Sequence, residues 1–285
     1  MKGALARLEE WSGEGTSVAE IEEALAQLRD ASDLRTSVMT HTAWVPEEWL
    51  DAARETLAGL AERHPSRTII LVPRPEDEDS LDARVSLHCF PLVGGERHVC
   101  SEVIELDLRG RRAAAPASIV LPLLLPDIPV FLRWRGQPSF GSDVFGRLVE
   151  VVDRLVVDSR EWIGDVTDIA PYFDRTAVSD ISWARTLPWR AALAQLWPDV
   201  SDTRQLRVAG PRSEAVLLTG WLRARLAHRV ELLHEAAAEL EDVVADGERV
   251  PVPAGKRRSA SDLLSDELDR FSRDPIYEEA VRAVS

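Results

Sequence analysis

Tryptophan and arginine residues in two short segments are the side chains of this sequence best suited to binding a partner. They are Arg133, Trp134, Arg135, Trp183, Arg185 and Trp189. Both residue types are enriched at the centres of protein interfaces, because they bury a large area and form hydrogen bonds at their edges. An arginine is costly to bury unless a carboxylate or a phosphate balances its charge. The two segments therefore favour a partner-binding surface, while internal stacking of arginine on tryptophan explains them equally well.

Arg67 is a candidate for anion binding. It ends the segment His64-Pro-Ser-Arg67, between the expected end of a helix and the start of a strand. Arg67, Arg133, Arg135 and Arg185 could together hold a sugar phosphate, since guanidinium groups form paired hydrogen bonds with phosphate oxygens. A segment of this kind also serves simply to end a helix before its proline. Both interpretations of Arg67 stay open.

A cluster of histidine and cysteine is formed by His88, Cys89, His98 and Cys100. If Gly94-Gly95 is a two-residue hairpin turn, Cys89 lies opposite Cys100, and His98 shares the face of Cys100. The spacing matches no common zinc motif. We expect buried, reduced cysteines that pack as small apolar side chains, with metal binding as the alternative. Neither a metal nor a cofactor is predicted.

Other functional classes find little support in the sequence. It contains no glycine-rich phosphate loop and no Gly-x-Ser-x-Gly motif, so neither nucleotide binding nor serine hydrolysis is indicated. The formal net charge of −15 disfavours nucleic acid as a partner. Prolines and an aspartate interrupt the longest apolar run, residues 119–132, so no membrane span is expected. With two cysteines and no apparent signal peptide, the sequence predicts a non-enzymatic cytoplasmic protein.

The elements that must position these residues alternate between helices and strands. Ser17 and Glu20 have the spacing of a capping box at the start of an amphipathic helix. Strands are predicted over 35–41, 68–72, 85–89, 104–108, 128–132, 155–157 and 205–208, and helices over 46–63, 143–152, 188–197 and 214–227. A partly β region at 231–248 precedes a last helix that Ser261 is expected to cap. This order predicts an α/β (mixed α+β) fold with two mixed α/β domains, 1–165 and 166–285, whose sheets are flanked by helices.

The segment Leu121-Pro-Leu-Leu-Leu-Pro-Asp-Ile-Pro-Val-Phe-Leu-Arg-Trp-Arg-Gly136 resembles the glucose-6-phosphate dehydrogenase assembly protein family (OpcA-type) of bacteria. Further matching pieces occur in the family's order from about residue 35 to the C-terminus. Among them are His64-Pro-Ser-Arg67, Asp153-Arg-Leu-Val-Val-Asp-Ser159, Asp180-Ile-Ser-Trp-Ala-Arg185, Thr186-Leu-Pro-Trp-Arg190 and Asp274-Pro-Ile-Tyr-Glu278.

The resemblance implies a non-catalytic assembly factor or allosteric activator that binds glucose-6-phosphate dehydrogenase in the oxidative pentose phosphate pathway. It carries over no catalytic residues. Two other hypotheses follow from the residues themselves. One is a sugar-phosphate-binding enzyme or sensor that uses the arginine cluster, and the other is a metal-dependent module at Cys89 and Cys100.

Overall fold

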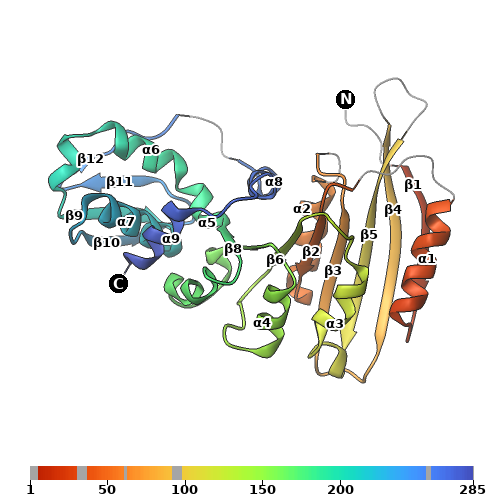
Figure 1. Cartoon of the computed structure of the whole chain (residues 1–285). Coiled ribbons are helices and arrows are strands. Elements are labelled where there is room, and N and C mark those ends of the chain that lie inside the picture. The colour runs from red at the N-terminus through yellow and green to blue at the C-terminus, as the bar shows by residue number, and fades with distance from the viewer. Residues whose placement is uncertain (1–5, 31–36, 61–62, 92–97, 255–257, 285) are drawn as a thin grey trace. The chain divides into compact units, whose positions relative to one another are not determined.

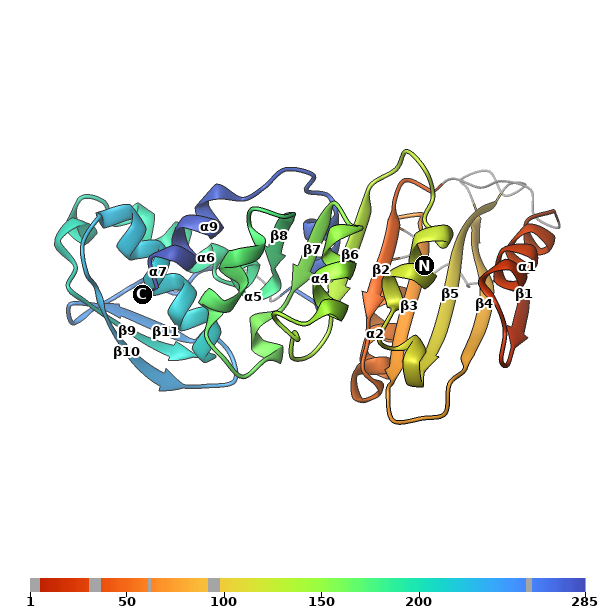
Figure 2. The same cartoon turned by 60° about the horizontal axis from the view of Figure 1, so that its bottom comes forward.

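The computed structural model describes residues 6–30, 37–60, 63–91, 98–254 and 258–284. The chain divides into two compact units, residues 1–155 and 156–285. Each unit combines strands with helices (Figure 1 and Figure 2), so the predicted α/β class is confirmed. The domain boundary after residue 165 stays a prediction.

The N-terminal unit is built on a mixed sheet. Its strands are β1 (Ala6–Gly13), β2 (Thr40–Trp44), β3 (Arg67–Arg74), β4 (Leu81–Pro91), β5 (His98–Arg109) and β6 (Val130–Trp134). They follow the order β1-β4-β5-β3-β2-β6. The central strands β5, β3, β2 and β6 run parallel, while β4 is antiparallel to both β1 and β5. Strand β7 (Arg154–Val157) contains the boundary between the units.

Four helices accompany this sheet in the described part of the N-terminal unit. They are α1 (Val18–Asp30), α2 (Leu50–Ala58), α3 (Pro116–Val120) and α4 (Asp143–Glu150). The capping box predicted at the start of α1 is confirmed, since the Ser17 amide donates to the Glu20 carboxylate and the Glu20 amide donates to Ser17 Oγ. Helix α2 packs Ala53 on Ala43 and Ile70 of the parallel strands.

The C-terminal unit contains a smaller, four-stranded sheet. Its order is β10-β9-β11-β12, with bounds Glu231–Ala236, Gln205–Gly210, Asp242–Ala245 and Glu248–Arg249. The other elements of this unit are strand β8 (Ala177–Asp180) and helices α5 (Ile181–Arg185), α6 (Leu187–Gln195), α7 (Arg212–Leu226), α8 (Ala260–Leu268) and α9 (Pro275–Arg282). Helix α9 packs closely on α7, where a Cβ at Gly220 would collide with the carbonyl oxygen of Ala280.

Cys89 and Cys100 are joined by a disulfide between β4 and β5, which corrects the expectation of two reduced cysteines. The predicted pairing of Cys89 with Cys100 is confirmed, and both side chains are buried. Their Cα atoms are 4.0 Å apart, so directly opposed positions on neighbouring strands bring the two sulfur atoms together. The predicted turn at Gly94-Gly95 lies outside the described residues.

Two local predictions were wrong. The strand expected at 35–41 is β2, which spans Thr40–Trp44, so in the described part of that range the residues before Thr40 are not in a strand. The N-cap of α8 is Ser259, not Ser261, and Ser259 forms a capping box with Asp262. Within the described residues, no helix is both long enough and apolar enough to cross a membrane.

Candidate functional site

The first tryptophan–arginine segment lies at the carboxyl end of β6, beside the end of β2. Trp134 pairs with Trp44 across the two parallel strands, and their rings stack with centroids 4.8 Å apart. The ring of Phe145 from α4 forms a T-shaped contact with Trp134, also with 4.8 Å between the centroids. Because Trp134 is only 2% exposed, this aromatic cluster belongs to the core of the N-terminal unit.

The two arginines beside Trp134 are also buried. Arg133 donates a hydrogen bond to the carbonyl oxygen of Trp134. The guanidinium of Arg135 lies over the ring of Trp49, 4.8 Å from its centroid. The same ring approaches Gly136, whose φ of +75° favours glycine. These contacts place Arg133 and Arg135 among internal partners.

Arg67 has partners on two sides. Its Nε donates to Glu102 Oε2 over 2.7 Å, and its Nη1 donates to the carbonyl oxygen of Leu123 over 2.7 Å. The Arg67 and Glu102 side chains are each 5% exposed. An anion at Arg67 would have to compete with the carboxylate of Glu102, and anion binding there stays a prediction.

Arg67 and Arg133 occupy different positions along the strand direction of the sheet. Arg67 pairs with Thr40, whereas Arg133 pairs with Ala43, three residues further along the same strand. Three residues of a strand span about 10 Å. The backbone register therefore separates two members of the proposed phosphate-binding set.

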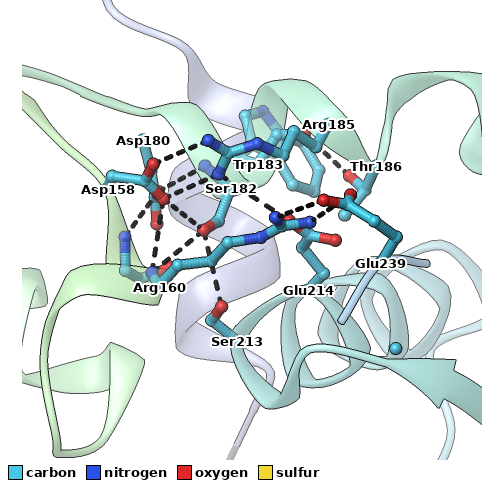
Figure 3. A network of polar contacts seen from close by, with 12 residues as sticks. Asp158, Arg160, Asp180, Ser182, Trp183, Arg185, Thr186, Ser213, Glu214 and Glu239 are labelled. Carbon is cyan, nitrogen blue, oxygen red and sulfur yellow. Dashed lines mark hydrogen bonds and ion pairs between the residues drawn. The ribbon is translucent and has the colours of Figure 1, made fainter. Parts of the chain in front are cut away.

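The second segment takes part in a buried ion-pair network of the C-terminal unit (Figure 3). Arg185, the last residue of α5, donates from both terminal nitrogens to the two oxygens of Asp158, each over 2.8 Å. Ser182 Oγ donates to the same carboxylate over 2.7 Å. Asp158 is 5% exposed, so it provides the buried countercharge that Arg185 requires.

A second arginine extends the network towards α7. Arg160 Nε donates to Glu214 Oε1 over 2.5 Å, and its terminal nitrogens donate to both oxygens of Glu239. Glu214 lies in the first turn of α7 and is fully buried. Burial raises the pKa of Glu214, and the hydrogen bond from Arg160 acts in the opposite direction.

Asp180 is a buried carboxyl of the network whose pKa is raised. It caps α5, accepting hydrogen bonds from the amides of Ser182 (2.8 Å) and Ser159 (3.1 Å). The hydroxyl of Tyr277 lies 3.4 Å from its other oxygen. Burial, followed by the nearby charge of Asp158, raises the pKa of Asp180 to about 7.

The two tryptophans of this segment are buried beside the network. Trp183 donates from Nε1 to Asp274 over 2.9 Å, and the guanidinium of Arg190 lies 3.4 Å from the centroid of its ring. Burial lowers the pKa of Arg190 to about 10. Trp189 lines a cavity of about 600 Å³ together with Arg160, Arg185 and Glu214.

The structure thus brings the predicted residues into two separate groups. Arg133, Trp134 and Arg135 lie in the N-terminal unit, and Trp183, Arg185 and Trp189 in the C-terminal unit. No sequence pattern indicates a role for the carboxylates that complete the network. They are Asp158, Asp180, Glu214 and Glu239. The signal that could have found Asp158 is its position directly after the buried strand β7.

No group of three or more metal-ligating side chains occurs in the part of the chain that the structure describes.

Comparison with known proteins places the chain in a family. Residues 58–172 match the N-terminal domain and residues 176–254 the C-terminal domain of the family described as the glucose-6-phosphate dehydrogenase subunit, OpcA type. The chain belongs to the OpcA-type glucose-6-phosphate dehydrogenase assembly family. This confirms the resemblance inferred from the sequence.

Curated relatives of the chain come from cyanobacteria. It is 26% identical to a protein of Synechocystis sp. over 182 residues, which cover 59% of this chain and 38% of the relative. It is 24% identical to a protein of Nostoc punctiforme over 181 residues, which cover 59% of this chain and 39% of the relative. Both are provisionally named as the OxPP cycle protein OpcA. The matched region spans about two fifths of the length of these relatives.

Proposed function

We propose that this protein is a non-catalytic assembly factor and allosteric activator that binds glucose-6-phosphate dehydrogenase in the cytoplasm. The observation that carries the proposal is the family match, which covers residues of both compact units. The names of the cyanobacterial relatives support a role tied to the oxidative pentose phosphate pathway. Activation requires that the protein bind the active form of the dehydrogenase more tightly than the inactive form.

The internal contacts of the arginines support a binding role over sugar-phosphate chemistry. Arg67 contacts Glu102, and Arg185 contacts Asp158, each through hydrogen bonds of 2.7–2.8 Å. A phosphate would have to displace these carboxylates from buried positions. Such a displacement would break charge pairs whose loss is expensive in a protein interior.

The six tryptophan and arginine residues remain our candidates for partner binding, and their burial defines how they would act. Trp134, Trp183 and Trp189 are 2–5% exposed. They offer little surface to a partner directly. We infer that they hold the surrounding backbone in the shape that the partner recognises, which makes them positioning residues.

Co-elution tests the proposal. The purified protein and the dehydrogenase from the same organism are mixed and separated by size exclusion with light scattering. We expect a shared peak with a mass that exceeds that of either protein alone. Separate elution at micromolar concentrations of both proteins would contradict the proposal. Calorimetric heat with glucose 6-phosphate, without any complex, would instead favour the sugar-phosphate alternative.

A further inference from the structure

A groove runs along one face of α7. Arg212, Val216, Thr219 and Arg223 line a cavity of about 810 Å³ in the C-terminal unit. They follow one another at intervals of four, three and four residues, which is the spacing of a single helix face. At 1.5 Å per residue, this face is ~16 Å long. An arginine therefore lies at each end of the face, with Val216 and Thr219 between them.

The segment after β7 supplies apolar lining to the same cavity. It contains the short helices η4 (Ser159–Glu161) and η5 (Val166–Tyr172), and both contact α7. Trp162, Ile163 and Val166 of this segment line the cavity. Ile163 is 97% exposed, although its side chain is large and apolar. Single exposed apolar residues are ordinary, but this one borders a cavity with apolar lining of the kind that binds ligands.

The buried ion-pair network connects the two elements that line the groove. Arg160 belongs to η4 and lines the cavity, and its Nε donates to Glu214 in the first turn of α7 over 2.5 Å (Figure 3). The same guanidinium donates to Glu239, so these two carboxylates balance its charge. Arg160 therefore positions the groove but offers no free charge to a ligand.

The two arginines at the ends of the α7 face have no carboxylate partner among the described residues. Arg212 is exposed and forms neither an ion pair nor a side-chain hydrogen bond with them. Arg223 donates to the carbonyl oxygen of Val230 and to carbonyl oxygens after α9, which hold its side chain in place but carry no formal charge. Among the described residues, the lining includes one carboxylate, Asp165, which caps η5. Both arginines can therefore pair with an anionic ligand.

The position of Arg212 does not favour the stability of α7. It is the first residue of the helix, where the positive end of the helix dipole disfavours a cation. Pro211 occupies the N-cap, and no side chain caps the helix. Helix formation therefore does not explain a basic residue here, whereas a ligand that carries negative charge does.

We propose that this groove, which we call the α7 groove, docks an extended segment of the dehydrogenase with apolar side chains between two acidic ones. The two carboxylates pair with Arg212 and Arg223, and the apolar side chains cover Val216 and Ile163. An extended chain rises about 3.3 Å per residue, so ~5 residues span the length of the groove. A single phosphate group would contact only one end, because backbone carbonyls hold Arg223 at the other. The proposal rests on the function proposed above.

Two substitutions test the α7 groove, each with a matched control. Arg212→Glu places a carboxylate at the first position of a helix, where the dipole favours it, so a loss of binding would not reflect a weaker helix. Its control is Arg229→Glu, the same substitution at an exposed residue of the same unit that does not line the groove. Ile163→Ser removes the exposed apolar contact. Its control is Val252→Ser, since Val252 is 66% exposed and lies outside the groove.

The dissociation constant for the dehydrogenase is measured by biolayer interferometry for the wild type and the four variants. We expect Arg212→Glu to weaken binding ~10-fold, because it replaces an attraction with a repulsion. We expect Ile163→Ser to weaken it ~5-fold, and both controls to stay within ~2-fold of the wild type. Circular dichroism confirms that each variant is folded.

The contrary outcomes are distinct. If the wild type binds and Arg212→Glu binds as tightly as Arg229→Glu, the α7 groove is not the docking site, while the proposed function stands. If the wild type does not bind, the proposed function fails and this inference fails with it. If the protein alone is a dimer by light scattering and Arg212→Glu makes it a monomer, a second copy occupies the groove and the dehydrogenase does not.

Discussion

Replacing Asp158 with alanine is expected to lower the free energy of unfolding by ~3–5 kcal/mol. Asp158 accepts two hydrogen bonds from Arg185 and a third from Ser182, and it is 5% exposed. Its removal leaves the guanidinium of Arg185, whose side chain is 21% exposed, without its main countercharge. The loss of stability comes mainly from the partly buried charge of Arg185 that has lost its partner, and less from the lost attraction between the two charges. Urea denaturation at pH 7 measures the effect.

The control for this prediction is an exposed ion pair of the same unit. Arg249, whose side chain is 70% exposed, contacts Asp242 over 2.9 Å. Arg249→Ala should change the free energy of unfolding by less than ~1 kcal/mol, because water screens the pair. Equal losses for Asp158→Ala and Arg249→Ala would show that the buried network does not stabilise the protein.

The stability of the protein is expected to fall by ~4 kcal/mol between about pH 4 and pH 7 because of Asp180, a change that Asp180→Asn should remove. Burial and the charge of Asp158 raise the pKa of Asp180 from an ordinary 3.8 to about 7. Below pH 3.8, the carboxyl is protonated in both states and costs nothing. Between pH 3.8 and 7, only the unfolded state ionises, so each pH unit favours unfolding by ~1.4 kcal/mol. Above pH 7, both states are ionised and the cost is constant.

Urea denaturation of the wild type and Asp180→Asn at pH 5, 6, 7 and 8 checks this slope. A neutral asparagine can still accept hydrogen bonds from the Ser159 and Ser182 amides, so the cap of α5 is retained. We expect the difference in stability between the two proteins to shift in favour of the variant as the pH rises, and then to level off above pH 7. Parallel stability curves for the two proteins would contradict a raised pKa at Asp180.

The parts of the fold that carry strong local signals could be predicted from the sequence. The β-branched run of β3 and the alternation in β4 and β5 indicate strands, and the pairing of Cys89 with Cys100 follows from a hairpin. Strand β1 could not be predicted, because its sequence, Ala-Arg-Leu-Glu-Glu-Trp-Ser-Gly, has little strand character. It is a strand because it pairs with β4, where Trp11 lies opposite Val85.

The candidate site could be predicted only in part. Burial of Arg185 requires an anionic partner, a carboxylate or a phosphate, which the chemistry of arginine alone predicts. That this partner is Asp158, 27 residues earlier in the chain, depends on the packing of α5 against the segment after β7. Glu214 and Glu239 are further still from Arg160 in sequence, so no local pattern joins them.

The composition of the two tryptophan–arginine segments does not decide whether their aromatic rings bind a partner or stack internally. Trp134 stacks on Trp44, and Arg190 lies over Trp183, so in both units the aromatic rings are used internally. Trp197, in contrast, is 64% exposed, although composition alone does not distinguish it from the other tryptophans.

The most direct test of the central claim is the rate of glucose-6-phosphate dehydrogenase from the same organism, measured with increasing amounts of this protein at fixed substrate concentrations. Our account predicts a saturable rise in rate, with the midpoint at the dissociation constant of the complex. A rate that stays unchanged up to a large molar excess, with no complex by light scattering, would contradict the claim that this protein binds and activates the dehydrogenase.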